Sequence, residues 1–305
     1  MINTTAIIVI KDNPPYLKKT LASIDGFVEE IIIGTINCET ALQNQLEKNN
    51  KIKLFPLDPS IPFADIIKED LKKKAKGKYI LYVDPDEIFS KKIFDLLKKN
   101  IDKYDYFMIP RKNIIFGKWI QHSRWWPDYQ LRFFKKDSVV WPKEIHPIPK
   151  TKGHGFTLPA KEELAINHYN YNNLDQYFEK SFRYSKTEAR KAVLENKVIT
   201  LGETLKKSLN EFVSRYFAGE GYKDGAHGLI LAILQMFYYF MVFIFYWEEK
   251  KYFDVNNEEI FKETQTFFVS GLKETNYWLV NKKLINKKNN IKSKLLNKAI
   301  NLFKL

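Results

Sequence analysis

Cysteine is nearly absent from this sequence, because Cys38 is the only one among its 305 residues. A single cysteine cannot form an intrachain disulfide, and it cannot build a structural zinc site of the multi-cysteine kind. The cysteine content therefore predicts a protein of a reducing, cytoplasmic setting.

Three kinds of segment are also missing. The start, MINTTAIIVIKDNPP, has no positively charged beginning, and its apolar run from Ala6 to Ile10 is too short for the core of a signal peptide. We expect a first strand there. The sequence shows no internal repeat and no linker rich in glycine, serine or proline, which argues against a repeat architecture.

What is present is enough for a sizeable core and an unusual charge. Hydrophobic residues make up 45% of the 305 positions, which suffices for one large domain or for a domain with appendages. The formal net charge is +14, and residues 271–305, with nine lysines and one glutamate, carry +8 of it. We therefore expect an anionic partner to meet the C-terminal end of the chain.

The first half of the chain alternates apolar runs with stretches of helical spacing. Continuous apolar runs of this length are typical of strands covered on both faces; they are Thr5–Ile10, Glu30–Thr35, Lys51–Leu57 and Lys78–Val83. Strand and helix in repetition predict an α/β fold with a doubly wound, mostly parallel sheet. Ligands of such sheets bind beyond the carboxyl ends of the strands.

Three carboxylates crowd the end of the fourth run, in YVDPDEIFS: Asp84, Asp86 and Glu87. Acids this close raise one another's pKa unless a cation joins them. Mg²⁺ is held by one or two carboxylates together with substrate phosphates, which suits this pattern. A solvated loop whose acids cap a helix starting near Ser90 explains the same residues, and the pattern alone leaves both interpretations open.

The second half of the chain differs from the first in composition and in the spacing of its apolar residues. Residues 104–141 are rich in aromatic residues and loop signals, and helical spacing returns after His168. The 20 residues Gly228–Trp247 carry no charge, and as a helix they are long enough to cross a hydrocarbon core of about 30 Å. The lysine-rich tail has the pattern of a basic amphipathic helix, with apolar residues at spacings of 7, 4 and 7: Leu284, Ile291, Leu295 and Leu302.

Six segments follow in the order found in family 2 glycosyltransferases: AKGKYILYVDPDE, PRKNIIFGKWI, WWPDYQLRFF, VVWPKEIHP, INHYNY and FRYSKTEA. Across roughly residues 5–246 the chain resembles this family, and within it the branch of the lipopolysaccharide-core β-1,4-glucosyltransferases. The resemblance implies a GT-A fold, a nucleotide-diphospho-sugar donor, Mg²⁺ or Mn²⁺ as cofactor, and inversion at the anomeric carbon. It also implies a lipid-linked or cell-envelope glycan as acceptor.

The resemblance assigns roles to the acids. Asp84 and Asp86 match the family's Asp-x-Asp motif, so Asp86 would ligate the metal and Asp84 would face the ribose or the sugar. Glu87 would support this loop. Asp128 matches the general base that takes the proton of the acceptor hydroxyl; an ordinary loop aspartate is the alternative.

Other matched residues have weaker assignments. Arg132 would contact the diphosphate or fix the base, since arginine recognises either in a bidentate manner. His146 lies where some GT-A enzymes place a third metal ligand, although a lone histidine is often structural. For His168, packing and a supporting role are equally good interpretations.

Three tryptophans accompany the predicted base: Trp119, Trp125 and Trp126. Their rings would stack on the sugar rings of the acceptor, or else they belong to the core. Because they crowd beside Asp128, we expect at least one of them to bind the acceptor.

The chain departs from the family pattern after its second apolar run. The family carries a segment such as DSGSTDGT there, whereas this sequence reads GTINCET and lacks the first acid. Glu39 and Thr40 would replace the end of that motif, and Asp12 is predicted to supply part of the nucleotide pocket. This departure motivates an alternative function, an inactive GT-A domain that binds glycans or nucleotides without turnover.

A third candidate is a metal-dependent nuclease or nucleic-acid binder, suggested by the charge of +14. The basic excess is concentrated in the tail, so we expect no nucleic-acid partner. The leading prediction remains an inverting sugar transferase, organised as a catalytic domain (1–170), a helical extension (171–225), an apolar helix (226–250) and a region ending in the basic tail (251–305).

The apolar helix is compatible with a membrane span, a buried core helix, or a helix that lies in the cytoplasmic leaflet. A span would export the tail lysines, against the tendency of Lys and Arg to stay inside. We therefore expect peripheral or monotopic attachment at the inner face of the cell membrane, through the apolar helix and the tail.

Overall fold

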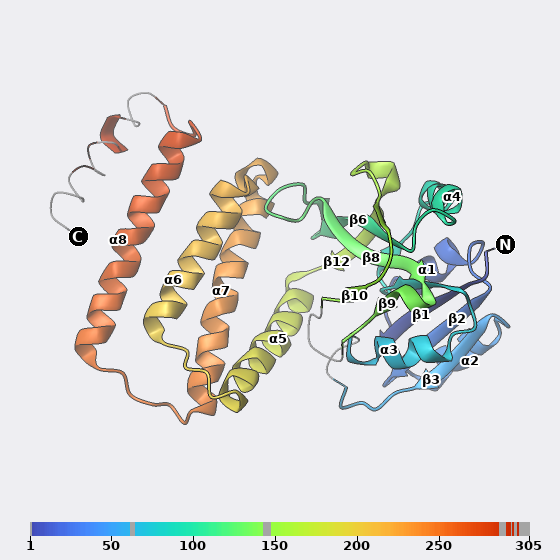
Figure 1. Cartoon of the computed structure of the whole chain (residues 1–305). Helices are drawn as coiled ribbons and strands as arrows, with labels where there is room; N and C mark the ends of the chain where they lie inside the picture. The colour runs from blue at the N-terminus through green and yellow to red at the C-terminus, as the bar shows by residue number, and fades with distance from the viewer. Residues whose placement is uncertain are drawn as a thin grey trace. The chain divides into compact units, whose positions relative to one another are not determined.

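The computed structural model describes residues 2–61, 65–142, 148–286, 291–293, 295 and 298. These residues form two compact units (Figure 1). The α/β unit comprises Met1–Ile115 and Trp126–Asn170. The helical unit comprises Phe116–Trp125 and Tyr171–Leu305, so ten residues from the middle of the chain pack with the C-terminal helices.

A mixed sheet forms the centre of the α/β unit (Figure 1). Its parallel half has the order β3 (Ile52–Pro56), β2 (Glu30–Ile36), β1 (Thr4–Lys11) and β4 (Tyr79–Val83). These are the four strands predicted from the apolar runs, and the predicted α/β class is confirmed. Each is a continuous hydrophobic run because the sheet is covered on both faces.

The other half of the sheet begins with an antiparallel strand. Next to β4 lie, in order, β8 (Asp128–Lys135), β6 (Tyr106–Ile115), β12 (Ile166–Tyr171) and β5 (Glu87–Ile88). The pairs β4–β8, β8–β6 and β12–β5 are antiparallel. The sheet is therefore more mixed than predicted, and the interpretation of residues 104–141 as rich in loops was wrong for β6 and β8. Polar side chains interrupt the apolar pattern of these two strands, which hid them.

Shorter strands complete this half. β9 (Val139–Val140) and β10 (Lys150–Thr151) pair with each other, and β11 (Gly155–Thr157) runs parallel to β6.

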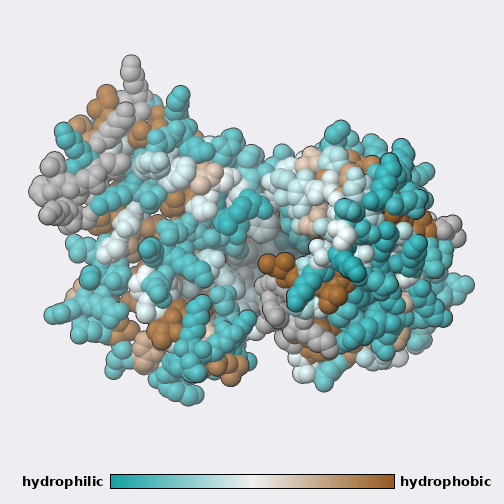
Figure 2. Space-filling model, viewed as in Figure 1, coloured by the Kyte–Doolittle hydropathy of each residue, from teal (hydrophilic) through white to brown (hydrophobic). Residues whose placement is uncertain are grey.

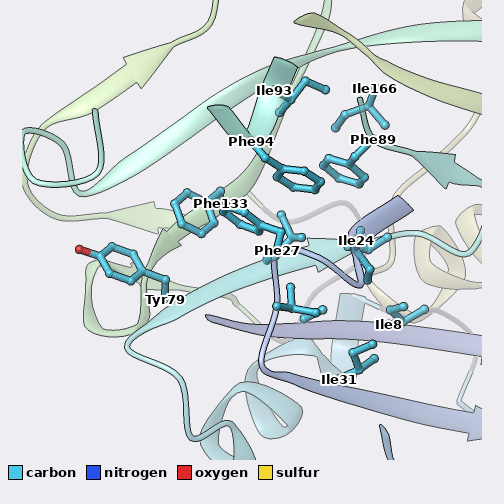
Figure 3. Packing of buried hydrophobic residues seen from close by; sticks show 14 of the residues in the cluster. Ile8, Ile24, Phe27, Ile31, Tyr79, Phe89, Ile93, Phe94, Phe133 and Ile166 are labelled. Carbon is cyan, nitrogen blue, oxygen red and sulfur yellow. The ribbon is translucent and has the colours of Figure 1, made fainter. Parts of the chain in front are cut away.

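Helices cover both faces of the sheet. Successive side chains of a strand point to opposite faces, so Ile8 of β1 packs with the helices α1 (Leu17–Ile24), α2 (Thr40–Glu47) and α4 (Lys91–Asn100). Its neighbour Ile7 packs on the other face, against α3 (Asp65–Lys74). Figure 3 shows the first face, where the rings of Phe27, Phe94 and Phe133 lie together in the core.

The helical unit contains α5 (Leu174–Leu194), α6 (Leu201–Val213), α7 (Ala226–Glu249) and α8 (Asn257–Asn281). α7 packs against α5 and α6, and α6 packs against α8. The predicted apolar stretch lies within α7, which is long and apolar enough to cross a membrane. One third of its most apolar window is buried against the rest of the unit.

The predicted amphipathic tail follows α8 and lies mostly outside the described residues. Leu284, Ile291 and Leu295 are described and are exposed, whereas Leu302 is not among the described residues.

Candidate functional site

The Asp84–Glu87 loop continues β4 at the carboxyl end of the parallel strands. Several backbone contacts hold it in place. Thr20 of α1 donates to the carbonyl of Pro85 (2.9 Å), and the Tyr169 amide of β12 donates to the carbonyl of Asp86 (3.0 Å). The carboxylates thus stand at a fixed position where α/β sheets bind their ligands.

These acids do not cap the next helix. Ser90 is the N-cap of α4, and its hydroxyl accepts a hydrogen bond from the Ile93 amide (3.4 Å). The interpretation of the acids as helix caps is therefore not supported, because Ser90 fills the cap position that it assigned to them.

A buried arginine ties two of the acids together. Arg132 of β8 is 3% exposed and donates from Nε (3.2 Å) and Nη2 (2.6 Å) to Oε1 of the fully buried Glu87. The same Nη2 donates to Asp84, and the Asp84 amide donates to Oε2 of Glu87 (3.1 Å). Buried charges need such partners. The buried ion pair of Glu87 and Arg132 therefore holds the position of Asp84.

The pKa values follow from these contacts. Burial opposes ionisation of Asp84, but the Arg132 guanidinium, assisted by Lys68 and Arg111, holds the pKa of this carboxyl well below its ordinary value. Burial raises the pKa of Glu87. Burial also opposes the charge of Arg132, but Asp84 and Glu87 raise its pKa, so the guanidinium stays charged.

A second arginine connects the Glu87–Arg132 ion pair to the predicted base. Arg111 of β6 donates from Nε (2.9 Å) and Nη2 (2.6 Å) to Oδ2 of Asp128, at the start of β8. Its Nη1 lies 3.4 Å from Oε1 of Glu87 and 3.7 Å from Oδ2 of Asp84. Antiparallel pairing of β6 and β8 places Arg111 directly opposite Asp128, so the sheet itself creates this ion pair.

Asp128 accepts further hydrogen bonds from two amides. Asn113 donates to Oδ2 (3.0 Å) and Gln130 donates to Oδ1 (2.7 Å). Burial alone would raise the pKa of Asp128, but Arg111 and these amides together hold it below its ordinary value. The side chain is 23% exposed, so this carboxylate is ionised at neutral pH and still reaches solvent.

A chain of polar contacts leads from Asp128 to Asp86. Because the Asn113 amide nitrogen donates to Asp128, its oxygen faces Nδ1 of the buried His168 (2.6 Å), which must carry a hydrogen there. Nε2 of His168 points toward Oδ1 of Asp86 at 3.6 Å. His168 therefore lies between the predicted base and the predicted metal ligand.

The described residues fit a divalent cation held by few protein ligands. Asp86 is 23% exposed, and one carboxylate with substrate phosphates and water is a usual arrangement for Mg²⁺. Within the described part of the chain, no group of three or more His, Cys, Asp or Glu side chains is arranged to hold a metal without such outside ligands.

A cavity of about 630 Å³ opens beside Arg132. It is lined by Arg132 and Gln130 of β8, by Lys68 of α3, and by the aromatic rings of Tyr106, Tyr129 and Trp141. This is the usual size of a small-ligand site. A ligand in this cavity would meet cationic and aromatic groups next to the carboxylates.

The remaining predicted residues lie elsewhere or outside the description. Asp12 is exposed at the end of β1, with positive φ (55°), and its amide donates to the Ile36 carbonyl of β2 (2.9 Å). Glu39 is the N-cap position of α2, which begins at Thr40. His146 lies outside the described residues, and so does Glu144, an acid of the same segment VVWPKEIHP.

The three tryptophans are divided between the two units. Trp119 and Trp125 belong to the helical unit, whereas Trp126 belongs to the α/β unit, and all three are half-buried. The Arg215 guanidinium of the helical unit lies 5.5 Å from the ring centre of Trp125.

The segment Phe116–Trp125 is anchored on a buried aspartate of the helical unit. The carboxylate of Asp224, 5% exposed, accepts from the amides of His122 (2.9 Å) and Gln121 (3.3 Å). Lys118 donates to the Asp224 carbonyl (2.7 Å). The turn that carries Asp224 is packed so closely that a Cβ on Gly228 would lie 1.8 Å from the Gly221 oxygen. The segment Phe116–Trp125 is thus held by a closely packed turn.

We expect Asp224→Asn to loosen this segment, since an amide keeps one acceptor oxygen where the carboxylate has two. The loss should cost about 1–3 kcal/mol of local stability and speed hydrogen exchange at Gln121 and His122. Asp254→Asn, at an exposed position of the same unit, is the matched control. Unchanged exchange in the Asp224 variant would show that the carboxylate does not hold the segment.

Sequence reasoning missed four site residues: Lys68, Arg111, Asn113 and Gln130. Arg111 and Asn113 belong to the segment PRKNIIFGKWI, where two polar residues two positions apart were a usable signal. On a strand, such residues share one face, and here that face carries the site.

Comparisons with known proteins give a fold-level likeness. No family model matches the sequence, so membership of family 2 remains a prediction from the motifs. The crystal structure of S. aureus TarS 1-349 is 13% identical with a TM-score of 0.42, over 90% of this chain and 80% of that one. The mannosyltransferase PcManGT from Pyrobaculum calidifontis, solved with GDP-Man and Mn²⁺, is 10% identical with a TM-score of 0.47, over 82% and 88%. Likenesses at this level assign no function to this chain.

Proposed function

We propose that this chain is an inverting glycosyltransferase. It transfers a sugar from a nucleotide-diphosphate donor to a lipid-linked or cell-envelope glycan, with Mg²⁺ or Mn²⁺ as cofactor. The observation that supports this most is the convergence of three acids at the carboxyl end of β4: Arg111 contacts Asp84 and Asp128, Arg132 contacts Asp84, and Asp86 lies beside His168. The ordered motifs shared with family 2 glycosyltransferases supply the reaction class.

Asp128 has the properties of a general base for an acceptor hydroxyl. Of its two oxygens, Oδ2 accepts three hydrogen bonds, whereas Oδ1 accepts one from Gln130. A carboxylate oxygen has two lone pairs, so Oδ1 keeps one with which to take a proton. Arg111 fixes the orientation of the carboxylate.

The other groups bind the donor. Asp86 is the ligand for the cation, which supplies charge neutralisation for the diphosphate. Asp84, held by Arg132, faces the donor's ribose or sugar, and Asp12 at the end of β1 contributes to the nucleotide pocket. Of the three tryptophans, Trp126 belongs to the same unit as Asp128 and offers a ring face for the acceptor.

The test is turnover with a panel of UDP-, GDP- and TDP-sugars in Mg²⁺ or Mn²⁺. We expect release of the nucleoside diphosphate from one donor class, faster when a glycan acceptor is added, and a product with inverted anomeric configuration by NMR. Retention of configuration would contradict the inverting mechanism.

One observation favours a second candidate, a GT-A domain that binds without turnover. The turn after β2, GTINCET, lacks the acid that the family places there, and Asp84 already has a guanidinium partner. Donor binding by calorimetry without release of the diphosphate, for every donor in the panel, would support this candidate and contradict the first.

A further inference from the structure

Helix α7 exposes an apolar stripe along one face. Six of its side chains are between 37% and 50% exposed: Leu229, Ile230, Ile233, Phe237, Ile244 and Trp247. From Ile230 onward they recur at spacings of three, four and seven residues, which keeps them on one side of a helix. No Asp, Glu, Lys or Arg occurs in residues 226–247. Hydrophobic patches interrupt the hydrophilic surface of the helical unit in Figure 2.

The other sides of α7 are committed to protein contacts, some of them polar. Gln235 donates to the Tyr177 hydroxyl of α5 (2.9 Å), and Tyr238 donates to Glu188 of α5 (2.9 Å). Lys207 of α6 lies 4.3 Å from the ring centre of Tyr239.

These contacts argue against a span. If α7 crossed a bilayer in this fold, the charged helices α5 and α6 would have to enter the hydrocarbon with it, which is very unfavourable. A helix that offers lipid only one apolar face is suited to lie in the membrane interface. Trp247, at the end of the stripe, is a residue type that favours that interface.

The sequence after α8 is strongly positive. Nζ of Lys282, at the end of α8, lies 3.1 Å from Oε1 of Glu220, in the turn before α7, so the end of α8 lies beside the beginning of α7. Residues 282–305 contain eight lysines and no acid. An anionic lipid surface complements this charge. A second copy of the chain would bring the same positive tail, so charge disfavours self-association.

We infer that the α7 stripe and the lysine-rich tail dock this protein on the surface of an anionic bilayer, with α7 lying along the interface and not across it. This docking is independent of the proposed transferase activity.

The test is flotation of the full chain with vesicles of phosphatidylcholine, with or without phosphatidylglycerol. The wild type floats with the anionic vesicles, and added salt weakens this binding because it screens the lysines. The triple variant Ile233→Gln, Phe237→Gln, Ile244→Gln loses roughly 10- to 100-fold in partitioning, since each position gives up apolar contact with lipid. Replacing Lys287, Lys288, Lys292 and Lys294 by glutamine removes the preference for anionic vesicles.

The control is Leu194→Gln with Val198→Gln, two side chains that are 82% and 68% exposed outside the stripe. This variant should partition as the wild type does. Thermal melts establish that each variant is folded, and the single change Ile233→Gln replaces the triple variant if the latter is not.

Four results would overturn the inference. The first is wild-type protein that stays with neither kind of vesicle, and the second is a folded stripe variant that floats as well as the wild type. The third is cleavage of the tail by protease added outside sealed spheroplasts. The fourth is a wild-type dimer that the stripe changes dissociate without any effect of vesicles. The third would establish a span, and the fourth would make the stripe a contact between two copies.

Discussion

Asp128→Asn is expected to lower the rate of sugar transfer by roughly 10²-fold or more, because the variant cannot accept the proton of the acceptor hydroxyl. The environment should tolerate this change. The asparagine oxygen can take the place of Oδ2 toward Arg111 and Asn113, and the Gln130 amide can rotate to accept from the new NH₂ group. Arg111 keeps Glu87 (3.4 Å) and Asp84 (3.7 Å) as anionic neighbours.

The measurement is kcat for transfer, together with donor affinity by calorimetry. Donor affinity should stay close to that of the wild type, as should the activity of the control Asp95→Asn, at an exposed position of α4. A variant that keeps most of its transfer rate would move the base elsewhere, and Glu144 is then the next candidate.

The pH dependence of transfer gives an independent check on Asp128. The base form is the carboxylate, which exists above the pKa, and in the folded protein this pKa lies below the ordinary value. Transfer should therefore be insensitive to this group at neutral pH and fall only at a pH below about 4, the ordinary pKa of aspartate. An acid limb near neutrality that Asp128→Asn abolishes would contradict the lowered pKa.

Asp86→Ala is expected to abolish the part of the affinity for a nucleoside diphosphate that depends on Mg²⁺ or Mn²⁺. The reason is that Asp86 is a carboxylate of this loop that is 23% exposed and lies beside Nε2 of His168 (3.6 Å), whereas Arg132 binds Asp84 and Glu87. The fold should survive, since the side chain is partly exposed and its backbone carbonyl still accepts from Tyr169.

Calorimetry with UDP and GDP, with and without metal, measures this effect. Asp95→Ala serves as the control for removal of an exposed carboxylate. If Asp86→Ala binds the diphosphate equally well with and without metal, at the wild-type affinity measured in metal, the assignment of Asp86 as the metal ligand is wrong.

The parallel half of the sheet could be read from the sequence because its signals are local. Each of its strands is an apolar run that must be buried on both faces, and the predicted run 30–35 differs from β2 (Glu30–Ile36) by one residue. The same logic placed Asp84, Asp86 and Glu87 at the end of β4. The strands β6 and β8 were not predicted, because polar site residues stand where apolar residues would have marked a strand. These residues are Arg111, Asn113, Asp128, Gln130 and Arg132.

The sequence by itself determined the α/β class, the strand-end position of the acids and the apolar character of α7, because these depend on residues adjacent in the chain. Tertiary structure decided which cation meets which acid: Arg132 is separated from Glu87 by 45 positions, and His168 from Asn113 by 55. It also decided that Phe116–Trp125 is held by Asp224, 102 positions from His122, and that α7 exposes one apolar stripe while it packs against α5 and α6. Such partnerships depend on strand pairing and helix packing, and no local pattern contains them.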